Sequence, residues 1–165
     1  GIVYHARYFS RINPAAYLFA AAFLLQAALL SHFAMSRPDA SFRPRADLAG
    51  VAGAVLVAYA LVVYPLIGYA VGQRYPATPT FGLPCPTTIF TFGVLLWATP
   101  RVPLRLLVIP TLWALLGISA ASSHGIAQDY GLPVAAVVAC AVAVWSRGRF
   151  PAPLGSGSER LRLGV

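Results

Sequence analysis

Long uncharged apolar runs, separated by short segments that contain arginine, constrain this chain more than any other feature. A helix needs about 20 mostly apolar residues to cross a bilayer, and runs of that kind recur along the sequence. Only 10% of the 165 residues are charged and 59% are hydrophobic, whereas soluble domains carry about 25% charged residues. The pattern predicts an all-α, polytopic membrane helical bundle, and it argues against a soluble enzyme, a secreted disulfide scaffold or a disordered chain.

The runs predict a membrane helical domain over residues 1–146 with about five spans, near 14–34, 48–72, 81–99, 103–123 and 132–146. The third is the exception, because its apolar part before Pro100 covers 13 residues, or roughly 20 Å of helix against a hydrocarbon core of about 30 Å. With the uncharged FGLPCP before it, the stretch reaches 19 residues. The third element is therefore either a broken span or a re-entrant half-helix. Residues 147–165 are basic and rich in Gly, Pro and Ser, which predicts a disordered tail.

The twelve basic residues are all arginine, and their positions predict orientation. A nucleic-acid binder would gather them into a patch, but most lie between apolar runs, so the expected partner is the lipid bilayer and not nucleic acid. Five crossings leave nine arginines on one side and three on the other, and a re-entrant third element gives the same ratio. Because cytoplasmic loops carry the excess of positive charge, both arrangements place the C-terminal tail in the cytoplasm. We favour five crossings. That arrangement places the first residue outside the cytoplasm, and it therefore also implies a helix upstream of Gly1.

The segment QRYPATPTFGLPCPTTIFTFG is the most specific part of the sequence. Its four prolines argue against a regular helix through it; they are Pro76, Pro79, Pro84 and Pro86. A helix that starts inside the membrane has unpaired N–H groups and positive dipole character at its first turn. Several transporters hold anionic groups in this way. The segment therefore predicts either a ligand site or a rigid, proline-braced start to a helix.

The candidate ligand-binding residues are Cys85, Thr87, Thr88, Arg74 and Tyr75. Either threonine is expected to cap the helix, and a cysteine beside a helix N-terminus can be held as a thiolate. Arg74 and Tyr75 lie on the approach to it. In the alternative reading, Cys85 is a small buried residue. No spacing typical of a metal or catalytic motif occurs, so no catalytic residue, metal ligand or cofactor is assigned.

Acidic residues are few, and all are expected in loops or in the tail: Asp39, Asp47, Asp129 and Glu159. The predicted spans therefore lack the acidic residues that a proton relay inside the membrane would need, which argues against a proton-coupled pump. Small residues at four-residue spacing let helix backbones approach closely. The positions expected to form such packing seams are Gly68, Gly72, Gly117, Ala121 and Gly125.

The stretches RINPAAYLFAAAFLLQ, RYPATPTFGLPCPTTIFTFG, VIPTLWALLGISAA and QDYGL resemble a bacterial domain-of-unknown-function family of small polytopic integral membrane proteins. The resemblance covers most of residues 5–145. It implies further hydrophobic sequence upstream, and it carries no assigned activity, so it assigns no functional residue.

These observations predict an uncharacterised multi-pass protein of the bacterial inner membrane. Small size, scarce intramembrane charge and the small-residue seams favour a non-enzymatic accessory or structural subunit that binds other membrane protein subunits. Two alternatives stay open. One is a small-solute, anion or metal transporter with its site at the proline-rich break around Cys85. The other is a membrane thiol enzyme that uses Cys85.

Overall fold

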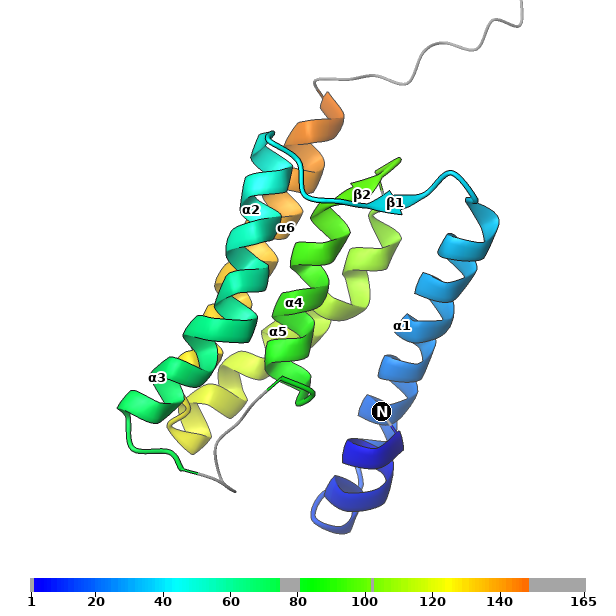
Figure 1. Cartoon of the computed structure of the whole chain (residues 1–165). Helices are drawn as coiled ribbons and strands as arrows, with labels where there is room; N and C mark the ends of the chain where they lie inside the picture. The colour runs from blue at the N-terminus through cyan, green and yellow to red at the C-terminus, as the bar shows by residue number, and fades with distance from the viewer. Residues whose placement is uncertain (1, 75–80, 102, 149–165) are drawn as a thin grey trace, which may run out of the picture.

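The computed structural model describes residues 2–74, 81–101 and 103–148, and this part of the chain is almost entirely helical (Figure 1). The elements in chain order are η1 (Ile2–Tyr8), η2 (Phe9–Arg11), α1 (Ala16–Ser36), β1 (Ser41–Phe42), α2 (Leu48–Ala58), η3 (Tyr59–Val63), α3 (Tyr64–Ala70), α4 (Pro84–Leu96), β2 (Ala98–Thr99), α5 (Arg105–His124), η4 (Ala127–Tyr130) and α6 (Gly131–Gly148). The predicted all-α fold is confirmed. The tail predicted at 147–165 lies almost wholly outside the described residues.

Four helical stretches of the described chain are long and apolar enough to cross a membrane: Ala16–Ser36, Leu48–Ala70, Arg105–Ser123 and Ala127–Arg147. The second joins α2, η3 and α3 end to end. Its start is fixed by Asp47, whose side chain accepts a hydrogen bond from the Gly50 N–H. Its middle contains Pro65, which has no N–H to donate, and the π-helical turn η3 directly before α3 makes room for this residue.

The shorter helix α4 runs through the bundle from end to end. It begins near the end where α3 stops, and β2, directly after it, pairs antiparallel with β1 in the loop between α1 and α2 (Figure 1). In that pairing Ser41 lies opposite Thr99 and Phe42 opposite Ala98. Residue 99 therefore lies at the other end of the bundle from residue 71. At 13 residues, α4 is shorter than each of the four long apolar stretches.

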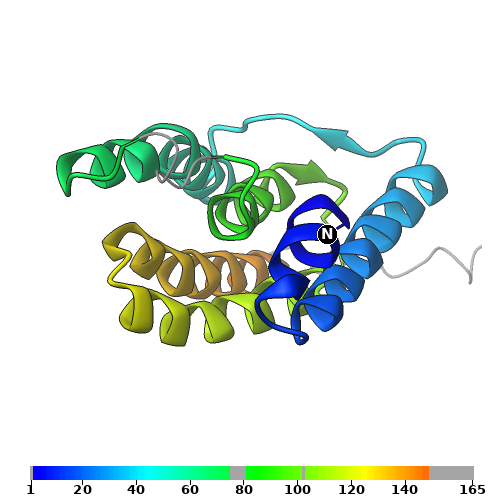
Figure 2. The ribbon, with the colours of Figure 1, turned by 90° about the horizontal axis from the view of Figure 1, so that it is seen from below.

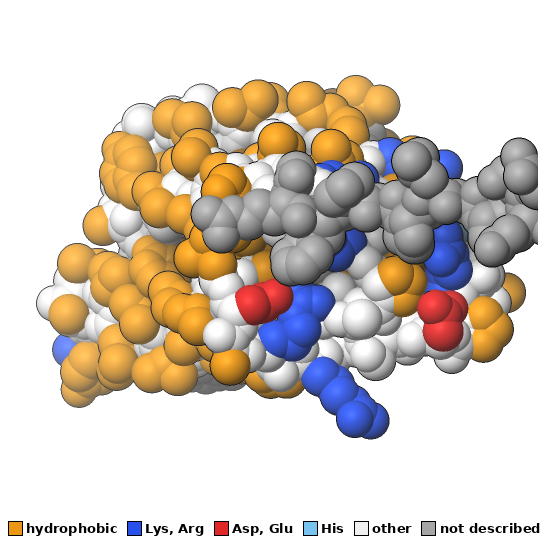
Figure 3. All heavy atoms as spheres, turned by 90° about the horizontal axis from the view of Figure 1, so that it is seen from above, with side chains coloured by type: hydrophobic (Ala, Val, Ile, Leu, Met, Phe, Trp, Pro, Cys, Tyr) orange, Lys and Arg blue, Asp and Glu red, His pale blue; other side chains and the backbone are white. Residues whose placement is uncertain are grey.

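The two ends of the bundle differ in charge. One end, called here the arginine-rich end, carries six of the nine arginines in the described part of the chain: Arg37, Arg43, Arg45, Arg101, Arg105 and Arg147. Figure 3 looks onto this end and shows arginine side chains gathered there, with apolar side chains around them. The other end carries Arg7, Arg11 and Arg74. It is called here the Asp129 end, after the carboxylate described below.

The core is built around α4. Viewed along the bundle, α2, α3 and α4 form one layer and α5 and α6 another, with α1 at the side (Figure 2). The closest approach is between α2 and α4. A Cβ added at Gly53 would lie 2.7 Å from the Gly93 carbonyl oxygen, and one added at Gly93 would lie 2.8 Å from that of Gly53. The Trp97 indole then donates to the Gly50 carbonyl at 3.0 Å. These glycines let the two backbones touch, so most of α4 is enclosed by the longer helices.

Candidate functional site

The proline-rich segment starts a helix earlier than the threonines predicted it would. Helix α4 begins at Pro84 with Leu83 as its N-cap, and no side chain caps it. Pro84 and Pro86 both lie in the first turn, where a missing N–H costs nothing. The Thr87 N–H donates to the Leu83 carbonyl at 3.2 Å. Two of the first four residues thus have no N–H and a third is bonded, so the helix start offers little to an anion. The predicted threonine cap is wrong, because the helix begins at Pro84, before both threonines.

The two threonines stabilise the fold of the segment itself. Thr88 is buried, and its hydroxyl donates back to the Pro84 carbonyl at 2.8 Å. The Thr87 hydroxyl oxygen accepts from the Gly82 N–H at 3.2 Å, and Gly82 has a φ of 104°, a conformation that favours glycine. Phe81 stacks edge-on against Phe90 with ring centroids 5.0 Å apart. Residues 81–83 are therefore folded back against α4, as the rigid-start reading expects.

Arg74 belongs to the end of α3. Its guanidinium donates to the Tyr69 carbonyl at 2.6 Å and to the Gln73 carbonyl at 3.1 Å, and it lies 3.9 Å from the centroid of the Tyr69 ring. A cation at the C-terminus of a helix satisfies carbonyls that the helix leaves unpaired. Within the described residues, Arg74 thus contacts Tyr69 of α3 and Gln73 directly after it, and not Cys85. Tyr75, also predicted for the site, lies outside the described residues.

Cys85 instead meets a carboxyl group that sequence reasoning had placed in a loop. The thiol of Cys85 interacts with the side chains of Asp129 and Trp113. Asp129 comes from the short helix η4 and is only 3% exposed, and its carboxylate accepts a hydrogen bond from the buried Tyr64 hydroxyl of α3. The expectation that every acid lies in a loop or in the tail is therefore wrong for Asp129, which lies buried in the short helix η4. Three elements, α3, α4 and η4, bring Tyr64, Cys85 and Asp129 together.

A second set of hydrogen bonds surrounds this group. The fully buried Gln128 donates from Nε2 to the Gln73 side-chain oxygen at 2.6 Å, and its backbone carbonyl accepts from the Tyr59 hydroxyl at 2.9 Å. Gly131 makes room for Tyr59, because a Cβ there would lie 2.3 Å from the tyrosine oxygen. The Gln128 Oε1 atom is buried and has no hydrogen-bond partner among the described residues. Tyr59, Tyr64, Gln73, Cys85, Gln128 and Asp129 together are called the buried polar cluster here.

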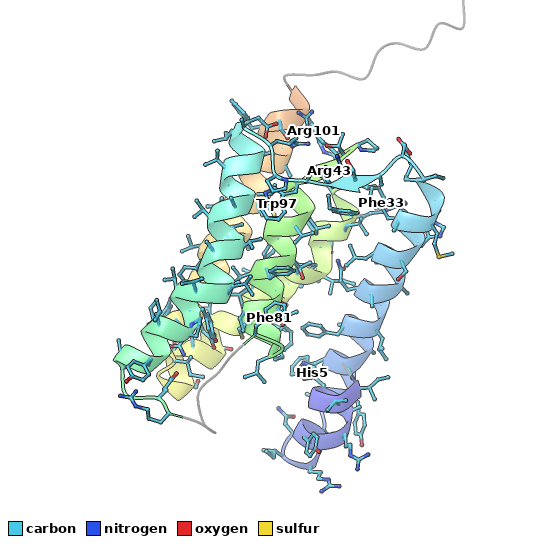
Figure 4. The ribbon with its side chains drawn as sticks, in the orientation of Figure 1. His5, Phe33, Arg43, Phe81, Trp97 and Arg101 are labelled. Atoms are coloured by element: carbon cyan, nitrogen blue, oxygen red, sulfur yellow. The ribbon has the colours of Figure 1, made fainter. Side chains whose placement is uncertain are left out.

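The cluster continues through Trp113 to the N-terminal segment. His5 of η1 is buried against Phe19, Phe23 and Trp113, with ring centroids 5.7, 5.2 and 5.4 Å away (Figure 4). Burial lowers the pKa of His5 to about 4. At neutral pH this histidine is therefore an uncharged member of an aromatic group. Trp113 thus joins the segment η1 on one side to Cys85 on the other.

The predicted packing positions divide into two kinds. Gly117 faces Leu132 of α6, because a Cβ there would lie 2.7 Å from the leucine side chain. Gly68 and Ala121 are buried. Gly72 and Gly125 have φ angles of 88° and 63° and open space where a Cβ would be. They end α3 and α5 in the left-handed conformation that favours glycine, and they do not lie at a helix contact.

The comparisons place the chain in a family. A family model described as "Family of unknown function (DUF6064)" matches residues 1–152. The chain belongs to this family, which confirms the resemblance to a family without an assigned activity. No curated protein and no solved structure matches the chain. Its membrane character is suggested by the four apolar helical stretches.

Proposed function

We propose that this member of the DUF6064 family is a non-enzymatic accessory or structural subunit of a larger assembly in the bacterial inner membrane. One observation carries the proposal. The polar groups of the proline-rich segment and its surroundings bond mainly to one another or to their own backbone, as the contacts of Thr88, Arg74 and Tyr64 illustrate. An enzyme needs such groups directed at a substrate. Here Thr88 and Arg74 bond to the backbone of their own segments, and Tyr64 joins α3 to η4.

The charge distribution supports an orientation for the subunit. Of the nine described arginines, six lie at the arginine-rich end and three at the Asp129 end. The described C-terminal helix α6 ends at the arginine-rich end (Figure 1). Because positive charge accumulates on the cytoplasmic side, we propose that this end and the C-terminal tail face the cytoplasm. The N-terminal segment η1 would then lie towards the outer face.

Purification from native membranes tests the proposal. The tagged chain is extracted in a mild detergent and, in parallel, in native lipid nanodiscs, and the eluted particle is analysed by size and by mass spectrometry. We expect the chain to elute above its 17.5 kDa monomer mass plus the detergent or nanodisc, with another membrane protein in constant ratio. A tagged unrelated membrane protein of similar size serves as control. A monomer without a partner in both preparations would contradict the proposal.

A second candidate function is cation or proton transport, and the buried polar cluster favours it. An ionisable residue buried within a membrane bundle marks a functional site by default, and Asp129 is of this kind. Its neighbours Cys85 and Gln128 add a sulfur and an amide oxygen that has no hydrogen-bond partner within the described part of the chain. Carboxylate, amide oxygen and sulfur are cation ligands. A carboxylate also repels anions, so the cluster favours a cation over an anion as the transported species.

Transport is tested with purified protein in liposomes. Proton flux is followed with an enclosed pH-sensitive dye, and metal flux with added zinc chloride and an enclosed zinc dye. The candidate predicts a flux that Asp129→Asn abolishes and Asp39→Asn, at the other end of the bundle, leaves unchanged. The transport function would be excluded if liposomes with the native chain were no more permeable to protons and zinc than empty liposomes.

The third possibility, a thiol enzyme, has the least support from the described contacts. Reactive cysteines lie in positively charged and partly exposed surroundings, whereas Cys85 meets a carboxyl group and an indole. We expect Cys85 to react with a thiol reagent at neutral pH more slowly than a free cysteine does. Fast modification of Cys85, measured in the Cys140→Ala background, would bring the enzyme hypothesis back.

A further inference from the structure

Helix α5 contains a proline at a position where a regular helix needs an N–H group. Pro110 is the sixth residue of the helix, which runs from Arg105 to His124. A proline inside a helix cannot donate to the carbonyl four residues earlier, and its ring bends the helix. That carbonyl belongs to Leu106. Inside a membrane no water can replace the missing donor, so a neighbouring helix has to supply one.

Gln26 of α1 supplies this donor. It lies at the middle of α1 and is only 7% exposed. Its Nε2 atom donates to the Leu106 carbonyl at 3.0 Å. Its Oε1 atom is buried and has no hydrogen-bond partner among residues 2–74, 81–101 and 103–148. An unpaired buried acceptor costs at least as much free energy as one neutral hydrogen bond returns. The amide therefore adds little to the overall stability, and its effect is local to the break in α5.

Helix α1 also contacts α5 on the other side of the break. Phe23 packs edge-on against Trp113, with ring centroids 5.2 Å apart. Since Leu106 precedes Pro110 and Trp113 follows it, α1 holds both halves of α5. Trp113 in turn interacts with the thiol of Cys85 in the buried polar cluster. The bend of α5 thus depends on α1, and the position of Trp113 beside Cys85 depends on the bend.

We propose that α1 fixes the bend of α5 at Pro110 and thereby controls access to Cys85 and the buried polar cluster. While α1 is docked, Trp113 stays against Cys85. When α1 moves away, α5 is free to bend at Pro110, and Trp113 leaves the thiol. Helix α1 suits this role because it lies at the side of the bundle (Figure 2) and buries few of its residues: Ala16, Ala20, Gln26 and Phe33. The device does not rest on either proposed function, and it applies to a structural subunit and to a transporter alike.

Hydrogen exchange of the full chain in lipid nanodiscs, read by mass spectrometry, tests the proposal. The variant Gln26→Met keeps a long side chain in place and removes the amide. The matched control is Ser31→Ala, which removes a polar group from the exposed side of α1. Loss of one neutral hydrogen bond corresponds to about two- to tenfold faster exchange, and we expect this effect for Gln26→Met in residues 107–116. Exchange in α6 should stay unchanged, and Ser31→Ala should behave as the native chain does.

The reactivity of Cys85 provides a second measurement. N-ethylmaleimide is added at neutral pH, and modification is followed by peptide mass, so that Cys140 can stay in place. Gln26→Met should be modified at Cys85 faster than the native chain and the Ser31→Ala control. Faster exchange in α5 with an unchanged rate at Cys85 would contradict the link between α1 and the cluster.

A variant of the proline itself shows whether Gln26 acts through the break. Pro110→Ala restores the N–H that the Leu106 carbonyl lacks, so in this background Gln26→Met should no longer change the exchange of residues 107–116. The same effect of Gln26→Met in both backgrounds would overturn the proposal. Exchange in Gln26→Met that is as slow as in the native chain would also overturn it, and this result does not require Pro110→Ala to fold. Equally faster exchange throughout the chain would show a general loss of stability and no control of the bend.

Discussion

The two ends of the bundle are held by opposite means. At the arginine-rich end, partly exposed charged groups clamp the end of α4: Arg45 is bonded to Leu96, Ala98 and Thr99 and paired with Asp47. At the Asp129 end, buried polar groups join α3, α4 and η4 through Tyr64, Cys85 and Asp129. Exposed ion pairs contribute little because water screens them, whereas a buried polar group without its partner is costly. The Asp129 end should therefore be the more sensitive to substitution, although it carries the smaller number of charges.

Asp129→Ala should have the largest effect. It leaves the Tyr64 hydroxyl buried without an acceptor and opens a small cavity, and each unpaired buried group costs about 1–3 kcal/mol. We expect about 3 kcal/mol of destabilisation and a clearly lower unfolding temperature, followed by tryptophan fluorescence in a mild detergent. Asp39→Ala, at the arginine-rich end, removes the same group from an exposed loop and should change little. Equal effects of the two variants would contradict the contrast between the ends.

Tyr64→Phe should come next, because it removes one hydroxyl and keeps the ring in the core. The cost is the loss of one bond to a carboxylate, about 1.5–3 kcal/mol. Tyr64 and Asp129 contact each other directly, so the double variant Tyr64→Phe with Asp129→Ala should cost less than the sum of the single ones. Additive costs in this thermodynamic cycle would mean that the hydrogen bond contributes nothing measurable.

Arg45→Ala should have a smaller effect, about 1–2 kcal/mol, since the side chain of Arg45 is 26% exposed and water can replace part of what is lost. The main consequence should be local. Faster hydrogen exchange is expected at Ala98 and Thr99, where β2 pairs with β1, and not at η4. Arg43→Ala is the matched control from the same loop. Unchanged exchange at β2 would show that Arg45 does not hold the end of α4.

The long helices could be predicted from the sequence because bilayer thickness sets the length of an apolar run. The run at 14–34 corresponds to α1 at Ala16–Ser36, and the run at 132–146 to α6 at Gly131–Gly148. The path of α4 could not be predicted in the same way. A helix of 13 residues can traverse the bundle because longer helices enclose it, and its contact with α2 depends on Gly53 and Gly93 meeting across space. Nothing in the sequence around either glycine indicates which helix it will contact.

The segment that contains the candidate site could be predicted from the sequence, but the carboxylate that Cys85 meets could not. The unusual composition around Cys85 indicated the correct segment, since prolines mark an irregular helix start. Asp129 was missed because it lies 44 residues further along the chain, and only the fold brings η4 beside α4. A signal was nevertheless present. The segment HGIAQDYG between two apolar runs contains an acid and no arginine or lysine, so Asp129 had no local cation to pair with, and burial against Tyr64 supplied its partner.

The smallest effect, and the sharpest test of the exposed end, concerns Asp47 and pH. The Gly50 N–H bond lowers the pKa of Asp47 below its ordinary value of 3.8, so the folded chain favours the ionised form. The resulting stability is present above pH 3.8 and is lost as the pH falls through the lower, folded-state pKa. Removal of a helix N-cap costs about 1 kcal/mol, so Asp47→Ala should be less stable than the native chain by about that amount at pH 7. The difference should shrink as the pH falls below 3.8 in chemical unfolding experiments. A difference that stays constant from pH 7 to pH 2 would mean that the carboxylate charge does not stabilise the start of α2, and that the arginine-rich end is held by its backbone contacts alone.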